Sequence, residues 1–250
     1  MSSYLITGSS RGLGLAMATK LLENPNNTVI ATARDTAGSP GLQQLAKKHS
    51  NDRLILIDLD VTDEQSVLNA AAQASEHLPH GLDHLLSNAG ISPNPTTSLD
   101  DLDIGETLDE INFNIKAALL VLRAFVPLVR RSTAKKIFVM TSVLGSLAAS
   151  SSMPNLANAY SVAKAALNML TRKWAAVLKE DGITTILMHP GYVGETDMGS
   201  SAREWIAKYA PDIRSIPLEQ SAAGCLAVLD RVTLEDNGDF FQWDGDKVPW

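Results

Sequence analysis

The stretch Thr7-Gly8-Ser9-Ser10-Arg11-Gly12-Leu13-Gly14 ends a short apolar segment and opens a stretch with helical periodicity. Three glycines let the backbone of such a turn come close to a ligand, and the amides at the start of the helix attract an anion such as pyrophosphate. The spacing G-x-x-x-G-x-G differs from the commoner G-x-G-x-x-G, and a glycine triplet alone is weak evidence. Its place between a first strand and a first helix favours a dinucleotide site over a merely tight structural turn.

Outward from this turn, short apolar segments alternate with helical stretches along the whole chain. The pattern predicts strands at residues 4–7, 29–33, 54–59, 84–87, 136–142, 184–189 and 239–243. It predicts helices at residues 13–23, 41–49, 64–78, 108–131, 158–180 and 218–230, and loops at 35–40, 92–103, 145–157 and 191–202. Such alternation implies right-handed crossovers and a parallel sheet covered on both faces. We therefore predict an α/β fold: a single doubly wound, Rossmann-type parallel sheet of seven strands in one domain, residues 1–250.

Composition excludes several other classes. The chain has 250 residues with 28 acidic and 21 basic side chains, and its formal net charge of −7 argues against nucleic acid as a partner. Cys225 is the lone cysteine and the first residues lack a signal-peptide pattern, which predicts a cytoplasmic protein. The longest apolar runs fall short of the roughly 18–20 residues that span a bilayer, so we expect no membrane segment.

His77, His80 and His84 are spaced like metal ligands, but helix-breaking residues separate them, and we expect no metal site.

The end of the second predicted strand distinguishes the two nicotinamide cofactors. A carboxylate there would accept hydrogen bonds from a ribose 2′-hydroxyl, whereas a guanidinium would pair with a 2′-phosphate. The sequence has Ala31-Thr32-Ala33-Arg34 at this point, and Arg11 in the glycine-rich turn supplies a second cation. The two arginines favour NADP(H) over NAD. Asp35, directly after Arg34, leaves open the alternative that both arginines are solvated surface residues.

A second group of chemically versatile residues lies further along the chain. Tyr160 and Lys164 are four residues apart in a predicted helix, so they share one face. A free phenol has a pKa of about 10, and a nearby ammonium would stabilise its anion. This pair alone is common on solvated helices. Ser142 ends the fifth predicted strand, at the sheet edge where ligands of such folds bind. Asn112 and Asn114 lie among apolar residues of a long helix, and structural capping is the alternative interpretation for such an amide.

Taken in order, these motifs resemble one family. The glycine-rich turn, Asn88-Ala89-Gly90, Ser142, Tyr160-x3-Lys164 and Pro190-Gly191 are similar to the compact short-chain dehydrogenases/reductases over nearly the whole chain. Within that family the sequence most resembles the carbonyl-reductase-like members, including the fungal norsolorinic-acid ketoreductase type. The residues that suggest this subgroup are Ser-Arg-Gly-Leu-Gly in the turn, Thr-Ala-Arg after the second strand and the closing residues 239–250.

The resemblance implies a role for each catalytic residue. Tyr160 would be the proton donor or acceptor, Lys164 would lower its pKa and hold the nicotinamide ribose, and Ser142 would fix the substrate carbonyl. Asn114 would complete a tetrad through a water to Lys164, and it is preferred to Asn112 because its spacing to Pro127 matches the family. The implied cofactor-binding residues are Gly8, Ser10, Arg11, Gly12, Leu13, Gly14, Arg34, Asp60, Val61, Asn88, Ala89, Gly90, Tyr160, Lys164, Pro190, Gly191, Val193 and Thr196.

Three departures from the family pattern concern the substrate side. Ser142 and Tyr160 are 18 residues apart, more than in the shortest members, which suggests an insertion at residues 148–155 near the mouth of the site. One extra residue follows Val193, so the match of Thr196 to the family's nicotinamide-carboxamide contact is in doubt. Ser87 replaces an asparagine, which is a minor change.

The resemblance implies an NADP(H)-dependent oxidoreductase, a carbonyl or keto reductase that transfers hydride between nicotinamide and a ketone, aldehyde or alcohol, with Tyr160 as general acid/base. The alternative is an NADP-binding redox sensor or regulatory scaffold without turnover. A non-redox lyase or isomerase would tend to replace the tyrosine or the lysine.

The expected partner is a small-molecule carbonyl or alcohol. The family also implies a homodimer or homotetramer built on the long helices at residues 108–131 and 158–180.

Overall fold

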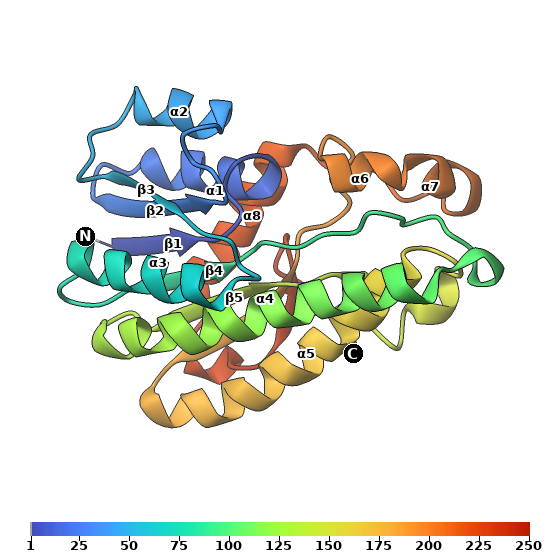
Figure 1. The fold of residues 1–250 in the computed structure, drawn as a ribbon. Coiled ribbons are helices and arrows are strands. Elements are labelled where there is room, and N and C mark those ends of the chain that lie inside the picture. Colours follow the sequence, from blue (N-terminus) through green and yellow to red (C-terminus); the bar gives the residue numbers. More distant parts are fainter. Residues whose placement is uncertain (1) are drawn as a thin grey trace.

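The computed structural model describes residues 2–250 and contains one seven-stranded parallel sheet in the order β3-β2-β1-β4-β5-β6-β7. The strands are β1 (Ser2–Ile6), β2 (Asn27–Ala33), β3 (Leu54–Asp58), β4 (His84–Ser87), β5 (Lys136–Met140), β6 (Thr184–His189) and β7 (Phe240–Gln242). Their carboxyl ends all point toward one edge of the sheet, which Figure 1 shows at the right. The predicted α/β fold with seven parallel strands is confirmed.

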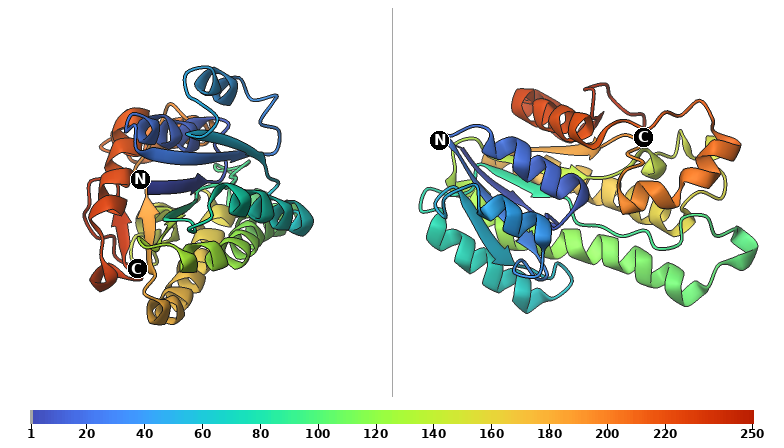
Figure 2. Two further views of the ribbon diagram at one scale, coloured as in Figure 1. Left: turned by 90° about the vertical axis from the view of Figure 1, so that its left-hand side faces the viewer. Right: turned by 90° about the horizontal axis from the view of Figure 1, so that it is seen from above.

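Helices cover both faces of the sheet, as the views in Figure 2 show. One face packs against α3 (Glu64–His77), α4 (Ile104–Arg131) and α5 (Asn158–Leu178), and the other against α1 (Gly12–Leu22), α2 (Pro40–Ala46) and α8 (Leu218–Arg231). Neighbouring strand residues serve opposite faces, because side chains alternate along a strand. Leu5 faces the first layer and Ile6 the second. Both faces of the central strand residues are therefore buried, and β3 has four consecutive apolar residues, at positions 54–57.

Helix α4 begins earlier than predicted, at Ile104 rather than at residue 108, because the carboxylate of Asp103 accepts a hydrogen bond from the amide of Glu106 and caps the helix. Among the helices described, α4 is long and apolar enough to cross a membrane, in contrast to the expectation from uninterrupted apolar runs. Of its most apolar window, 44% is buried. The buried residues from Ala117 to Val129 pack into the core that covers β1 and β4, as in the core helix of a globular protein.

The segment after β6 differs most from the prediction. Residues 191–202 were expected to form a loop, but α6 (Asp197–Ser201) lies within them and α7 (Arg203–Tyr209) follows directly. The hydroxyl of Thr196 accepts a hydrogen bond from the amide of Gly199 and so caps α6. Short 3₁₀ turns occupy Leu99–Asp101, Val143–Gly145, Ser150–Ser152, Lys179–Asp181 and Leu234–Asp236. Capping and tertiary packing, rather than helix propensity, explain the two added helices.

Candidate active site

The site lies where the strand order reverses, at the carboxyl ends of β1 and β4, because crossovers leave these neighbours in opposite directions and open a crevice. Side chains of Thr7 and Asn88 join the two strand ends. The Thr7 hydroxyl oxygen accepts hydrogen bonds from the amides of Asn88, at 2.9 Å, and Ala89, at 3.1 Å. The Asn88 Nδ2 donates to the carbonyl of Thr7 at 2.9 Å. Asn88 and Ala89 therefore fix the crevice wall through their own hydrogen bonds.

The glycine-rich turn forms a cradle that side chains would fill. Gly8 and Gly12 have φ values of +71° and +55°, a region that favours glycine. A Cβ at Gly14 would collide with the carbonyl oxygen of Gly8 and lie 2.9 Å from Asn88 Nδ2. Arg11 is the N-cap of α1 and makes no side-chain capping hydrogen bond. The first amides of α1 therefore face the turn without a protein side chain to cap them, an arrangement that suits a bound phosphate group.

The two predicted arginines have different surroundings. Arg11 forms an ion pair with Asp197 of α6 at 2.9 Å, and both side chains are exposed, by 80% and 74%. Arg34 is exposed after the end of β2, while Asp35 accepts a hydrogen bond from the amide of Gly38 within its own loop. In this structure the charge of Arg11 is therefore paired with Asp197, whereas Arg34 has no such ion pair in the described part of the chain.

Asp60 and Val61 follow β3 on the nucleotide side of the crevice. The Asp60 carboxylate accepts hydrogen bonds from the Thr62 hydroxyl at 2.7 Å and from the Thr62 amide at 2.9 Å. These bonds lower the pKa of Asp60, and nearby Arg34 adds a smaller lowering. Val61 is buried. The Asp60 carboxylate thus bonds within its own loop, to Thr62. Because its pKa is lowered, it remains ionised at neutral pH.

Asn114 is buried in α4, whereas Asn112 is exposed. The Asn114 side chain forms two hydrogen bonds with the segment after β4. Its Oδ1 accepts a hydrogen bond from the amide of Ile91 at 3.3 Å, and its Nδ2 donates one to the carbonyl of Ile91 at 3.0 Å. A Cβ at Gly90 would lie 3.0 Å from Asn114 Oδ1 and 3.5 Å from Lys164 Nζ. The fold therefore brings Asn114, Gly90 and Lys164 close together, and the tetrad that the resemblance implies stays a prediction.

Tyr160 and Lys164 lie one turn apart near the start of α5, both buried. Lys164 Nζ donates to the carbonyl of Met140 at 3.0 Å and lies 5.2 Å from the centre of the Tyr160 ring. Burial lowers the pKa of Lys164 to about 8. Burial also raises the pKa of Tyr160, and the charge of Glu110 raises it further. The Tyr160 pKa is therefore raised, where the resemblance implies a lowering by Lys164, because desolvation of the buried phenol is the largest effect.

Ser142 follows β5 and caps a 3₁₀ turn, where its hydroxyl accepts a hydrogen bond from the amide of Leu144 at 3.2 Å. Two neighbours that sequence reasoning missed hold this segment in place. The Thr141 hydroxyl donates to Asn168 Oδ1 at 2.6 Å, and Asn168 Nδ2 donates to the carbonyl of Gly145 at 3.2 Å. Asn168 is four residues beyond Lys164 in the sequence, and this spacing on the Tyr160 face of the helix was the available signal.

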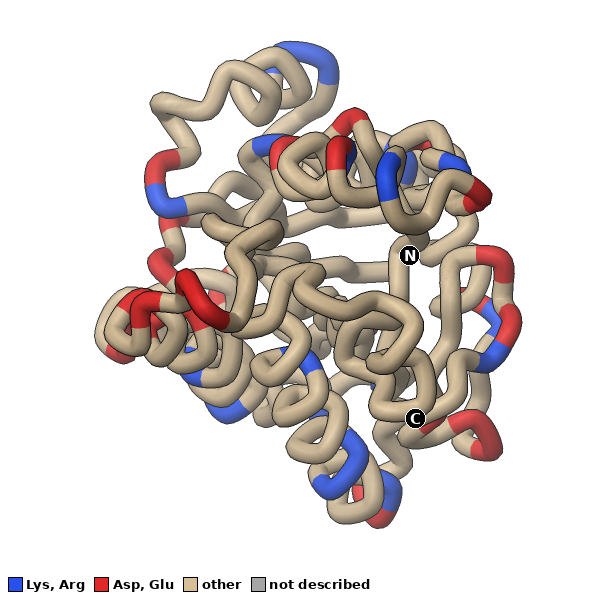
Figure 3. Tube along the Cα trace, turned by 90° about the vertical axis from the view of Figure 1, so that its right-hand side faces the viewer, with Lys and Arg blue, Asp and Glu red and all other residues tan. Residues whose placement is uncertain are grey.

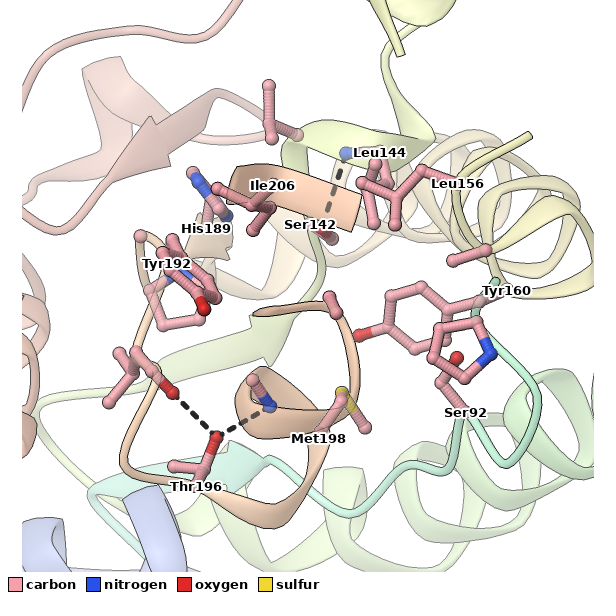
Figure 4. Close-up of a pocket in the computed structure, with 18 of the residues that line it drawn as sticks. Ser92, Ser142, Leu144, Leu156, Tyr160, His189, Tyr192, Thr196, Met198 and Ile206 are labelled. Carbon is pink, nitrogen blue, oxygen red and sulfur yellow. Dashed lines mark hydrogen bonds between the residues drawn. The ribbon is translucent and has the colours of Figure 1, made fainter. Parts of the chain in front are cut away.

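Ser142 and Tyr160 line one cavity of about 210 Å³, shown in Figure 4. Most of the remaining wall is apolar and comes from segments that follow β5 and β6, including Leu144, Met153, Leu156, Tyr192, Val193, Met198 and Ile206. Met153 belongs to the predicted insertion. None of the described lining residues is Asp, Glu, Lys or Arg. Figure 3 looks onto this side of the molecule, where charged residues lie mostly at the periphery.

His189, at the end of β6, also lines this cavity. Within residues 2–250 its Nδ1 is buried and has no hydrogen-bond partner. Burial lowers its pKa to about 4, so the imidazole is neutral at neutral pH. Sequence reasoning missed His189, although its place directly before Pro190-Gly191 was a positional signal.

The remaining predicted cofactor residues follow β6. The Pro190 carbonyl accepts from the Ser221 hydroxyl at 2.6 Å, and Gly191 has a φ of +78°. The Val193 carbonyl accepts from the Thr196 hydroxyl at 2.9 Å. A Cβ at Gly12 would lie 3.6 Å from the Thr196 methyl group. Despite the extra residue before it, Thr196 therefore lies between the glycine-rich turn and the cavity, with its hydroxyl engaged in capping α6.

The fold and this site define an oxidoreductase of the Rossmann type. The model of the short chain dehydrogenase family matches residues 3–207, and the chain belongs to this family. Curated relatives include a short-chain dehydrogenase/reductase, AacuF, of Aspergillus aculeatus, 35% identical over 96% of this chain and 96% of its own length. Another is the short-chain dehydrogenase RED3 of Pyricularia oryzae, 32% identical over 100% of this chain and 98% of its own length.

Solved structures similar to this chain include members of the same family. The NADPH-bound carbonyl reductase from chicken fatty liver has a TM-score of 0.86 and 32% identity, with 100% of this chain and 99% of that chain covered. A short-chain dehydrogenase/reductase from Burkholderia multivorans with bound NADP has a TM-score of 0.81 and 28% identity, with 100% and 99% covered. The predicted resemblance to carbonyl-reductase-like members of the family is confirmed. The finer resemblance to norsolorinic-acid ketoreductases stays a prediction.

Proposed function

We propose that this chain is an NADPH-dependent carbonyl reductase in which Tyr160 protonates the carbonyl oxygen. The observation that carries the proposal is the single cavity lined by both Ser142 and Tyr160, next to Leu13 and Thr196 on the nucleotide side. Lys164 and Asn114 bond to the backbone of Met140 and Ile91, each of which directly precedes a residue that lines the cavity. The intact tyrosine, lysine and serine favour turnover over a sensor or scaffold that binds NADP without reaction.

The glycine-rich turn supports a bound dinucleotide, because Gly8 and Gly12 adopt positive φ values and a Cβ at Gly14 would collide with the backbone of the turn. Exposed Arg34 would hold the 2′-phosphate, while Asp35 is occupied within its own loop. Two solved relatives contain NADPH or NADP. When bound, NADPH supplies the hydride and its two electrons to the carbonyl carbon. Arg11, at the start of α1, is the second cation near the glycine-rich turn, and its exposed ion pair with Asp197 engages one nitrogen of its guanidinium.

The protein supplies the proton that completes the reduction. The pKa of Tyr160 is raised by burial, so the phenol is protonated at neutral pH and serves as an acid. Its proton passes to the carbonyl oxygen as the carbon–oxygen π bond breaks, and an alcohol and a phenolate result. Lys164, with a pKa of about 8, is mostly a cation at neutral pH and stabilises that phenolate. Ser142 would donate a hydrogen bond to the same oxygen.

The cavity wall favours an uncharged substrate. Apolar side chains dominate it and none of the described lining residues carries a fixed charge, so a carboxylate would lose its hydration without gaining a partner. Ketones or aldehydes with apolar substituents fit this environment, because their burial is favourable and only the carbonyl needs a polar partner.

NADPH absorbance measured with acetophenone and with benzoylformate tests this proposal. The two ketones share a phenyl group and differ in a methyl or carboxylate substituent. We expect kcat/KM to be at least about tenfold higher for acetophenone, since the carboxylate must be desolvated. Faster turnover of benzoylformate would refute the uncharged-substrate class. Tight NADPH binding without turnover of any ketone, aldehyde or quinone would favour the sensor alternative.

We further propose that residues 1–250 act as one cytoplasmic domain and that α4 and α5 mediate a homodimer or homotetramer. Leu108 on α4 and Val162, Met169 and Val177 on α5 are large apolar residues with exposed side chains. These two helices pack against each other along their lengths. Contact between copies through these helices would remove that apolar surface from water.

A further inference from the structure

Glu110 is a buried acid whose position the proposed reaction leaves unexplained. Among the Asp, Glu, Lys and Arg residues that the structure describes, only Glu110 and Lys164 are buried, and Glu110 is 6% exposed. No basic group lies within ion-pair distance of Glu110 in the described part of the chain. Burial of an unpaired carboxyl group is costly, so such groups are rare outside functional sites.

The fold places this carboxyl group beside the cavity wall. Glu110 lies one turn before Asn114 on α4, and its carbonyl accepts a hydrogen bond from Asn114 Nδ2 at 3.0 Å. Asn114 also forms two hydrogen bonds with the backbone of Ile91. The next residue after Ile91, Ser92, lies near the Glu110 side chain. Ser92 lines the cavity on the same side as Tyr160 (Figure 4). Within residues 2–250, Glu110 Oε1 and Ser92 Oγ are both buried without a hydrogen-bond partner.

The groups around the Glu110 carboxyl determine what its charge would affect. Burial raises the pKa of Glu110. On α5, the titratable group that the Glu110 charge affects is Tyr160, because an ionised Glu110 raises the Tyr160 pKa. Lys164 has its own pKa lowered by burial alone. On α4 itself, Glu106 and Asp109 are exposed and face solvent, which screens their charges.

We propose that Glu110 is a positioning residue for proton transfer: placed near Ser92 behind the cavity wall, it opposes formation of the Tyr160 phenolate when it is ionised and leaves that phenolate unopposed when it is neutral. The inference rests on the proposed function of Tyr160. A neutral carboxyl leaves the phenolate stabilised by Lys164 alone, whereas a carboxylate places a second negative charge near the developing phenolate. No atom of Glu110 touches the reacting carbonyl in this scheme.

The pH dependence of alcohol oxidation tests the role of Glu110, because this direction requires the Tyr160 phenolate. The probe is the alcohol formed from acetophenone, with saturating NADP⁺. In Glu110→Gln we expect the rise of kcat with pH to move to lower pH by about 0.5–1 unit, since the opposing charge is gone. Asp109→Asn removes one exposed acid from the same turn and should leave the profile unchanged. An unshifted profile in Glu110→Gln, or an equal shift in Asp109→Asn, would overturn the proposal.

Two further measurements keep the test decisive. If Glu110→Gln does not fold, Glu110→Met removes the same charge with an apolar side chain of similar length, and its profile should shift in the same direction by a similar amount. If the alcohol is not oxidised, tyrosinate absorbance of the NADP⁺ complex, corrected with Tyr160→Phe, follows the same ionisation; no change with Glu110→Gln refutes the role. Oxidation that persists in Tyr160→Phe would instead refute the proposed function.

Discussion

The nucleotide half and the carbonyl half of the crevice are built from different parts of the chain. The nucleotide half consists mainly of backbone, with Gly8, Gly12 and Gly14 placed directly after β1. The carbonyl half consists mainly of side chains, such as Met153 and Ile206, from long segments after β5 and β6. Backbone recognition requires particular residues at particular spacings, whereas an apolar wall accepts many side chains of similar volume. The nucleotide half can therefore be recognised in the sequence as a motif, whereas the carbonyl half cannot.

Arg34 tests the nucleotide half with the larger expected effect. Arg34→Asp should weaken NADPH binding by about 10- to 100-fold, because a charge-assisted hydrogen bond worth about 1.5–3 kcal/mol is replaced by repulsion. NADH binding should change much less, since NADH lacks the 2′-phosphate. Titration of cofactor fluorescence with both nucleotides measures the ratio. Equal losses for the two cofactors would mean that Arg34 does not contact the 2′-phosphate.

Met153 tests the carbonyl half with the smaller expected effect. Met153→Ala enlarges the cavity, so KM for acetophenone should rise a few-fold, consistent with losing roughly 1 kcal/mol of apolar contact. The affinity for NADPH should stay unchanged, because Met153 lies in the insertion on the substrate side. Steady-state kinetics and a fluorescence titration separate the two effects. A parallel loss of NADPH affinity would show that the two halves are not independent.

The fold was predictable because its signals are local and repeated. Strands such as β2 and β6 have apolar centres, at residues 29–31 and 186–188, and the turn at Gly8 lies between a strand and a helix. By contrast, α6 contains Gly199 and two serines, which have weak helix propensity, and it exists through capping by Thr196. A single-sequence pattern does not report that capping geometry.

The site was predictable by residue identity more than by electrostatics. Ser142 and Tyr160 line one cavity, and Asn114 bonds to the segment that leads to Ser92 in that cavity, because each follows or faces the carboxyl ends of the central strands. Their catalytic roles stay predictions. The direction of the Tyr160 pKa shift was not predictable, since it depends on burial and on Glu110 from another helix. Glu110 itself follows Asp109 in the sequence, and only the packing of α4 shows which of the two acids is buried.

Replacement of the proposed proton donor tests the central claim most directly. Tyr160→Phe removes only the phenolic hydroxyl, so NADPH should still bind within about threefold of the parent affinity while kcat for acetophenone reduction falls by about 10²–10⁴-fold. NADPH binding by fluorescence and NADPH consumption by absorbance, measured on the same preparation, give the two values. A variant that binds NADPH and reduces acetophenone at the parent rate would contradict the assignment of Tyr160 as the acid.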